Sequence, residues 1–269
     1  MRQGAAVAPA AALAVLLHAD AAPSLPKLGG MARPNGVVVV GERYWAFATT
    51  SGEVHEGTMP TQRRATHRIP IVRGLLQLAS ALRPLARGAG VARGSERLFL
   101  LAAVLLPLAL LPVLPARVEV PVGVALAAAL VVWLMRGRTL RLHGAEHRAI
   151  AAAERRSLVG TWEGSVRPSR FAARCGTNFA ALALPVTALA DRLWPFAAAP
   201  VASSVLVAVL SLGATMELWK AVQHPSGLLR GLILPGLALQ RLTTREPDLD
   251  DTRIALLATA SVLRRELKL

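Results

Sequence analysis

The sequence predicts a mainly α-helical membrane protein. We expect about four transmembrane helices in two hairpins, a small N-terminal β-rich cytosolic segment and a C-terminal amphipathic helix. The chain is 54% hydrophobic, above the roughly 45–50% of soluble domains. It also carries 31 Lys and Arg against 16 Asp and Glu, and apolar runs with basic flanks are typical of membrane spans. A nucleic-acid binder would share the charge but not the uncharged runs, and few aromatic residues are available for stacking on bases. No nucleic-acid partner is therefore expected.

The N-terminal residues divide into two parts. Residues 1–25 resemble a signal peptide because Arg2 precedes an apolar stretch, but Pro9 interrupts that stretch. We expect a variable, partly disordered or surface-lying extension instead. Residues 26–69 contain the β-branched run Val37 to Val40, a Gly-Glu pair and a second run from Arg43 to Thr49. This pattern favours a β-hairpin or meander.

Residues 70–96 begin with a basic amphipathic helix, in which leucines oppose Arg73, Arg83 and Arg87. Such a helix can lie in the membrane interface, or it can cover the β-rich segment. The sequence leaves both alternatives open.

Two pairs of apolar runs predict the two membrane hairpins, at residues 97–135 and 178–220. The first pair comprises Leu98 to Leu114 and Val118 to Met135, and the second comprises Asn178 to Ala190 and Val201 to Trp219. The runs lie near or below the lower limit of roughly 17–25 residues for a spanning helix, and the limb from Asn178 is the shortest.

Charge predicts the orientation. The N-terminal region, residues 136–177 and the tail after Lys220 are rich in Arg, whereas the two hairpin turns carry only Arg117 and Arg192. The positive-inside rule then places both termini and residues 136–177 in the cytoplasm. In the tail, residues 221–269, we expect Leu228 to Leu239 to be interfacial or packed on the bundle, and a last helix to begin near Asp250 and run to about Leu267.

The motif His143-Gly-Ala-Glu146-His147 lies in the central cytosolic segment. Positions i, i+3 and i+4 of a helix share one face, so two imidazoles and a carboxylate would point the same way. This arrangement predicts a site for a divalent metal, with zinc favoured. H-x-x-E-H is also the inverted zinc-hydrolase motif, in which Glu146 would be the general base. The alternative is an interfacial helix whose polar side chains meet water and lipid phosphate.

Two residues are candidates for the third metal ligand. Glu217 is a lone acid at the end of the last span, and Cys175 is the only cysteine, so it has no intrachain disulfide partner. Glu154 lies about 10 Å along the helix from His147, too far for the same ion, which favours an indirect role. The cluster Thr243 to Pro247 is either a turn with a helix cap or a polar wall that faces the His helix.

The chain resembles the DUF1385 or YqhQ-like family of bacterial membrane proteins. The matching segments are His143 to Arg148, Glu154, Arg174 to Thr177, Glu217 and Leu239 to Pro247. The resemblance implies a bacterial cytoplasmic membrane protein with a metal site. Four residues would surround the metal ligands: Arg174, Thr244, Arg245 and Glu246. The resemblance implies no particular substrate. The chain departs from the family pattern at Asn35, Ala153 and Ala172-Ala173.

Two functional hypotheses follow. The first is a metal-dependent hydrolase in the lipid bilayer with its site at the cytoplasmic surface. The second is a non-enzymatic membrane scaffold or assembly factor whose basic surface meets an anionic lipid or a soluble protein partner. A transporter is disfavoured because the spans lack paired polar residues near their middle.

Overall fold

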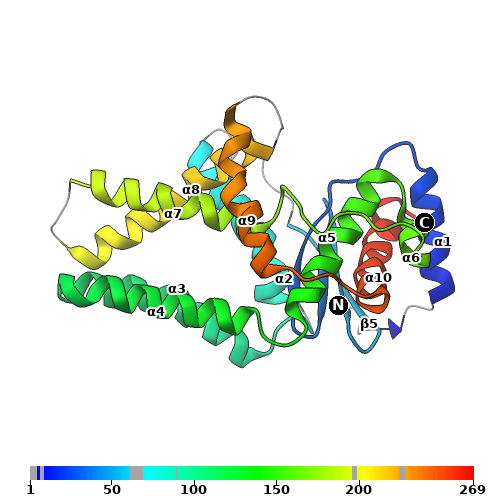
Figure 1. The fold of residues 1–269 in the computed structure, drawn as a ribbon, viewed down its shortest axis with the longest axis horizontal. Coiled ribbons are helices and arrows are strands. Elements are labelled where there is room, and N and C mark those ends of the chain that lie inside the picture. The colour runs from blue at the N-terminus through cyan, green and yellow to red at the C-terminus, as the bar shows by residue number, and fades with distance from the viewer. Residues whose placement is uncertain (1–4, 7–8, 61–68, 89, 196–198, 224–227) are drawn as a thin grey trace.

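The computed structural model describes residues 5–6, 9–60, 69–88, 90–195, 199–223 and 228–269. An N-terminal sheet and its covering helices form one part of the molecule, and two helical pairs extend from it in the same direction (Figure 1). The mainly helical fold with a small N-terminal antiparallel sheet is as predicted.

In the described part of the chain the sheet has five antiparallel strands, in the order β1-β5-β4-β3-β2. They are β1 (Ala5–Ala6), β2 (Gly29–Arg33), β3 (Gly36–Val40), β4 (Tyr44–Thr49) and β5 (Glu53–Thr58). Side chains alternate between the two faces of a strand, so Val37 and Val39 pack with helices on one face, whereas Val38 packs with Trp45 and Phe47 on the other. Burial of both faces explains the uninterrupted valine run.

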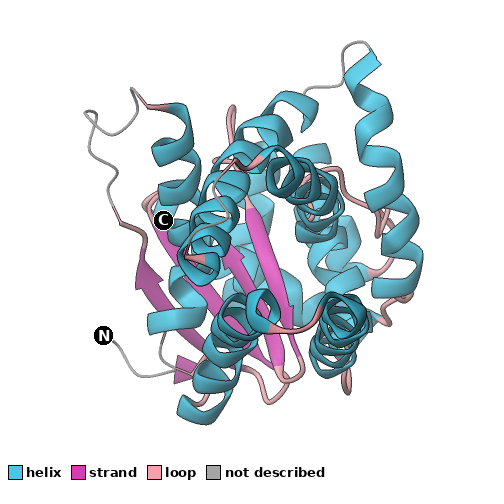
Figure 2. Ribbon diagram, turned by 90° about the vertical axis from the view of Figure 1, so that its left-hand side faces the viewer, coloured by secondary structure: helices cyan, strands magenta, loops and turns pink. Residues whose placement is uncertain are grey.

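Helices α5 (Thr139–Arg155) and α10 (Leu249–Glu266) pack on one face of the sheet. Viewed from the side of the extending pairs, the strands run through the middle of the molecule, with helices in front of them and behind them (Figure 2). The C-terminal helix occurs where it was predicted, but it is not a tail with one apolar stripe. It is buried around most of its circumference because the sheet covers one side while α1 (Pro9–Ala21) and α6 (Leu158–Glu163) cover another.

The N-terminal extension also differs from the prediction. Helix α1 begins at Pro9 and buries Ala12, Leu16 and Ala19 in the core. The Asp20 carboxylate accepts hydrogen bonds of 3.0 Å from the backbone N–H groups of Leu158 and Val159 at the start of α6. Proline is favoured at the first turn of a helix, so Pro9 starts α1 rather than disrupting it. Residues 1–4 and 7–8 of the extension lie outside the described residues.

The extending pairs are α3 (Gly94–Leu110) with α4 (Ala116–Leu134) and α7 (Gly176–Leu193) with α8 (Pro200–Gln223). Within the described residues, three stretches are long and apolar enough to cross a membrane: Gly94–Val113, Arg117–Leu134 and Pro200–Gln223. The predicted count of four is not confirmed, because α7 is not among them. Its sequence includes Asn178, Asp191 and Arg192.

Two further helices, α2 (Pro70–Arg87) and α9 (Leu234–Thr243), pack on the pair formed by α7 and α8. Helix α2 packs on α8 where Gly74 meets Gly213; a Cβ atom on Gly74 would lie 2.6 Å from the Gly213 carbonyl oxygen. Its later residue Leu85 packs on the sheet face with Val38. Helix α9 packs on α7, which is one of the two placements left open by the sequence.

A charged cluster joins the sheet to the first pair. Glu96 on α3 accepts hydrogen bonds from Arg33 on β2 at 2.8 Å and from Arg136, just after α4, at 2.6 Å. The Arg136 guanidinium also lies 3.7 Å from the centre of the Trp133 ring. Arg33 is almost fully buried, so removing Glu96 would leave a desolvated cation without its partner.

Candidate metal site

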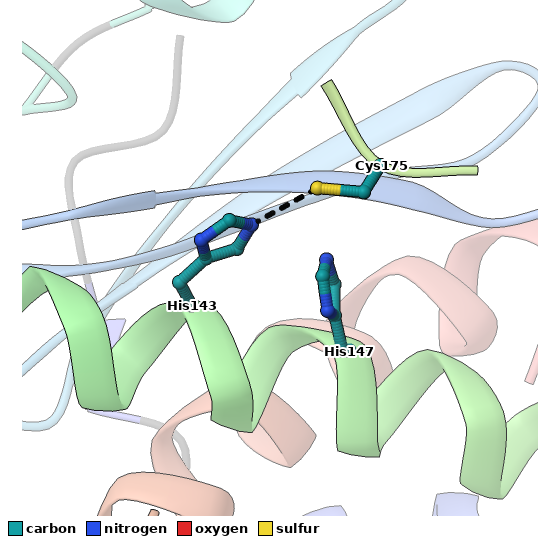
Figure 3. Close-up of side chains that lie close together, drawn as sticks. All are labelled: His143, His147 and Cys175. Carbon is teal, nitrogen blue, oxygen red and sulfur yellow. Dashed lines mark hydrogen bonds between the residues drawn. The ribbon is translucent and has the colours of Figure 1, made fainter. Parts of the chain in front are cut away.

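The site lies where α5 faces the start of α7. The one-turn spacing of His143 and His147 places both imidazoles on the same side of α5, and their ring centres are 4.5 Å apart. Both rings point toward Cys175, which precedes α7 (Figure 3). One ligand atom from each of the three residues lies within 4.8 Å of the other two. A single cation can therefore contact all three residues after small side-chain adjustments.

Hydrogen bonds fix which imidazole nitrogens are free. His143 Nδ1 lies 2.8 Å from the Thr243 carbonyl oxygen, and His147 Nδ1 lies 2.6 Å from the Arg170 carbonyl oxygen. A carbonyl oxygen only accepts, so each Nδ1 carries the proton and donates. Each neutral ring then presents the Nε2 lone pair, which is the arrangement typical of metal-ligating histidines.

The environment of the free nitrogens supports a ligand role. His147 Nε2 is buried and has no hydrogen-bond partner among the described residues, whereas buried polar atoms normally have one. His143 Nε2 lies 3.2 Å from Cys175 Sγ, and the sulfur accepts hydrogen bonds from the backbone N–H and the hydroxyl of Thr177. A cysteine sulfur binds a metal ion as the thiolate.

Glycine 144 allows a second chain segment to cross α5 beside the histidines. A Cβ atom on Gly144 would lie only 2.2 Å from the Arg245 carbonyl oxygen. The Arg245 N–H donates to the Leu140 carbonyl oxygen at 2.9 Å. This close crossing follows the end of α9, which supplies the Thr243 carbonyl to His143.

Buried amides hold the loop that carries Cys175. Gln240 on α9 is fully buried; its side-chain oxygen accepts from Ala172 N–H at 2.9 Å and its amide nitrogen donates to Ala172 O at 2.8 Å. Asn178 on α7 donates to the carbonyl oxygens of Ala172 and Ala173. Four side-chain contacts thus fix the backbone immediately before Cys175.

Arg148 on α5 links the loop before Cys175 to the segment after α9. Its buried guanidinium donates to the Pro168 carbonyl at 3.1 Å and to the Pro247 carbonyl at 3.3 Å, and it forms an ion pair with Glu246. A cleft of about 410 Å³ lies beside Arg148 and Glu246, and none of the three candidate ligands lines it.

A comparison with protein families matches residues 98–265 to DUF1385, described as a protein of unknown function. The chain belongs to this family. The resemblance to DUF1385 inferred from the sequence is thereby confirmed, and the matched residues include all three candidate ligands. Comparisons with curated proteins and with solved structures find no match.

The other predicted site residues lie outside the group formed by His143, His147 and Cys175. Glu217 on α8 forms ion pairs with Arg73 and Lys220, and it is not in the three-residue group. This placement favours Cys175 over Glu217 as the third ligand. Glu154 pairs with Arg174. Thr244 is buried, and its hydroxyl donates to the Gln240 carbonyl.

Glu146 is buried beside the histidines but faces β2. A Cβ atom on Gly30 would lie 2.9 Å from Glu146 Oε1, which shows how closely the carboxyl group approaches this strand. Burial raises the pKa of Glu146 from 4.5 to about 7, and the nearby His143 opposes this rise. The carboxyl group can therefore gain or lose a proton near neutral pH.

The sequence did not reveal the partners of the two Nδ1 atoms. Both partners are backbone carbonyls, of Thr243 and Arg170. Every residue has a backbone carbonyl, so the sequence does not reveal which one accepts a hydrogen bond. Arg148, Asn178 and Gln240 could have been noticed as polar residues inside or beside the motifs, but their partners are 5 to 99 residues away.

Proposed function

We propose that this DUF1385 protein is a multi-pass protein of a cytoplasmic membrane that holds one divalent cation between His143, His147 and Cys175. The observation that carries the proposal is the convergence of three ligand atoms within 4.8 Å, with both Nδ1 atoms already bonded to carbonyls. Two imidazoles and a thiolate suit zinc better than the oxygen-preferring Mg²⁺ or Ca²⁺.

We further propose that the centre is catalytic and hydrolytic. Three protein ligands are typical of catalytic zinc, whereas structural zinc usually has four. Bound zinc would supply Lewis-acid chemistry to a substrate oxygen or a water molecule. Glu146 is the proposed general base, supported by its burial beside the ligands; its side chain must swing from β2 toward the ligands to serve this role.

Charge supports the membrane orientation. The two hairpin turns expected outside carry Arg117 and Arg192, whereas the sheet side of the spans carries most of the arginines. The positive-inside rule then puts the sheet, the metal site and both termini in the cytoplasm.

Elemental analysis of the detergent-purified full chain tests the metal site. We expect about one zinc per chain, and loss of most of it in the His143→Ala/His147→Ala and Cys175→Ser variants. Glu217→Gln is the matched control, because its partners are Arg73 and Lys220, and it should retain the metal. Cobalt substitution adds a second measurement, since a thiolate ligand gives a near-ultraviolet charge-transfer band that Cys175→Ser should abolish. Equal metal content in all four proteins would refute the site.

A further inference from the structure

Helix α9 exposes an apolar face although it lies outside the candidate spans. Leu234, Ala238, Leu239 and Leu242 recur along one side of the helix and are exposed, Leu242 by 75%. The opposite side packs on α7, where Gly236 contacts Asn178. With only 10 residues, α9 is too short to cross a bilayer, so its apolar face requires another apolar neighbour.

The position of α9 corresponds to the boundary between lipid and water. Leu237 on α9 and Ala173 in the loop before Cys175 pack in the same cluster as Trp219. Trp219 lies near the sheet-side end of the candidate span Pro200–Gln223, and tryptophan is enriched at membrane interfaces. In Figure 1, α9 runs crosswise to α7 at this end. A short helix that lies across the spans at the level of an interfacial tryptophan has the geometry of an interfacial helix.

Charge at the end of α9 identifies the kind of lipid. Arg241 and Arg245 are exposed, and neither forms an ion pair with another described residue. Exposed cations beside an apolar face attract anionic headgroups near the membrane surface. The surface formed by Leu234, Ala238, Leu239, Leu242 and these two arginines is termed the α9 surface below.

The α9 surface is connected directly to the candidate ligands. The last residue of α9, Thr243, accepts the hydrogen bond from His143, and Gln240 holds the loop before Cys175. His143 is also the partly exposed member of the group, whereas His147 and Cys175 are buried. The accessible side of the site is therefore the histidine that α9 contacts.

We propose that the α9 surface lies in the headgroup layer of an anionic bilayer, and that the ligand of the metal centre is the anionic phosphate headgroup of a membrane amphiphile. The first half stands on the exposed face and its position. The second half rests on the proposed metal site. An amphiphile whose tails remain in the bilayer reaches the metal centre without leaving the membrane. Its phosphate then contacts Arg241 and Arg245.

A nitroxide label tests the first half without depending on metal. The label is placed by Leu242→Cys in a full-length chain that also carries Cys175→Ser, reconstituted into nanodiscs that contain phosphatidic acid. Leu17→Cys is the matched control, because Leu17 is 62% exposed on α1 of the sheet part. We expect the label at position 242 to be several-fold more accessible to oxygen, relative to a water-soluble nickel chelate, than the label at position 17. Equal ratios at the two positions would overturn the placement.

Cobalt-loaded protein tests the second half. We expect its visible absorption bands to shift in nanodiscs that contain phosphatidic acid, but not in phosphatidylcholine alone or with soluble glycerol phosphate at the same concentration. Leu239→Ser/Leu242→Ser should reduce the shift, and Leu17→Ser should not. Normal cobalt binding with no lipid-dependent shift overturns the headgroup assignment and leaves the metal site standing. An equal shift with glycerol phosphate assigns a soluble ligand and also overturns it, whereas absence of cobalt binding refutes the metal site itself.

Discussion

Gly144 offers a sharp test of how the metal site is assembled. In Gly144→Ala the new Cβ atom would lie 2.2 Å from the Arg245 carbonyl oxygen, whereas ordinary van der Waals contact begins at 3.4 Å, so one backbone must move by more than about 1 Å. A backbone carbonyl cannot rotate away as a side chain can. The movement therefore strains the Arg245 to Leu140 hydrogen bond and displaces the segment that follows Thr243.

The expected free-energy change combines two opposing effects. Overpacking costs about 1–3 kcal/mol, with the upper end appropriate for a backbone contact. Alanine favours a helix over glycine by about 1 kcal/mol. The net destabilisation is then about 2 kcal/mol, which lowers the Tm of a chain of this size by roughly 4–8 °C. Because Thr243 orients His143, zinc affinity should fall as well.

Thermal unfolding in detergent, followed by tryptophan fluorescence, measures the change in stability, and zinc titration measures the affinity. Gly123→Ala is the matched control: Gly123 is also inside a helix, but among the described residues its Cβ atom would meet only Leu111, at 3.4 Å or more. This control should unfold at or slightly above the wild-type temperature. If Gly144→Ala unfolded no earlier than Gly123→Ala and bound zinc normally, the crossing of Arg245 over α5 would be refuted.

Three further predictions concern the packing and charge around the site. Gly236→Ala should destabilise the protein by about 1–3 kcal/mol, because its Cβ atom would lie 2.1 Å from Asn178 Oδ1. The Cβ atom of Gly231→Ala would have none of the described atoms within 4 Å, and this substitution should have little effect in the same unfolding measurement. Gln240→Met should weaken zinc binding by about 10–100-fold, since it removes the bonds that hold the loop before the cysteine. Glu146→Gln should stabilise the metal-free protein increasingly as pH rises from 4.5 to 7, by about 3 kcal/mol in total.

The sign of the pH effect follows from the raised pKa. Between 4.5 and 7 the unfolded chain has lost the Glu146 proton while the folded chain keeps it, so the wild-type protein loses stability as pH rises, and the loss is complete above 7. Other titrating groups contribute equally to both proteins and cancel in the difference. Tm measurements in a chelator across this range test the prediction; a stability difference that is constant or shrinks with pH would contradict it. For Gln240→Met, unchanged zinc affinity in a correctly folded variant would show that the loop is held by other contacts.

The sequence alone determined the features that depend on neighbours along the chain. The apolar runs predicted four spans, and three of them correspond to the candidate spans of the structure, because hydropathy is a local property. The spacing of His143 and His147 predicted a shared helical face, because one turn of α5 separates them. The capped, periodic segment near Asp250 located the last helix.

Only the tertiary structure decided which distant groups meet. It placed Cys175 rather than Glu217 beside the histidines, because α7 begins opposite α5 and the Glu217 carboxylate forms an ion pair with Arg73. It made the C-terminal helix a core helix, since α1 covers the side that the sequence had left to solvent. It also supplied backbone carbonyls as partners of both Nδ1 atoms. Contacts of this kind depend on where chain segments cross, and residue identity along the chain does not encode a crossing point directly.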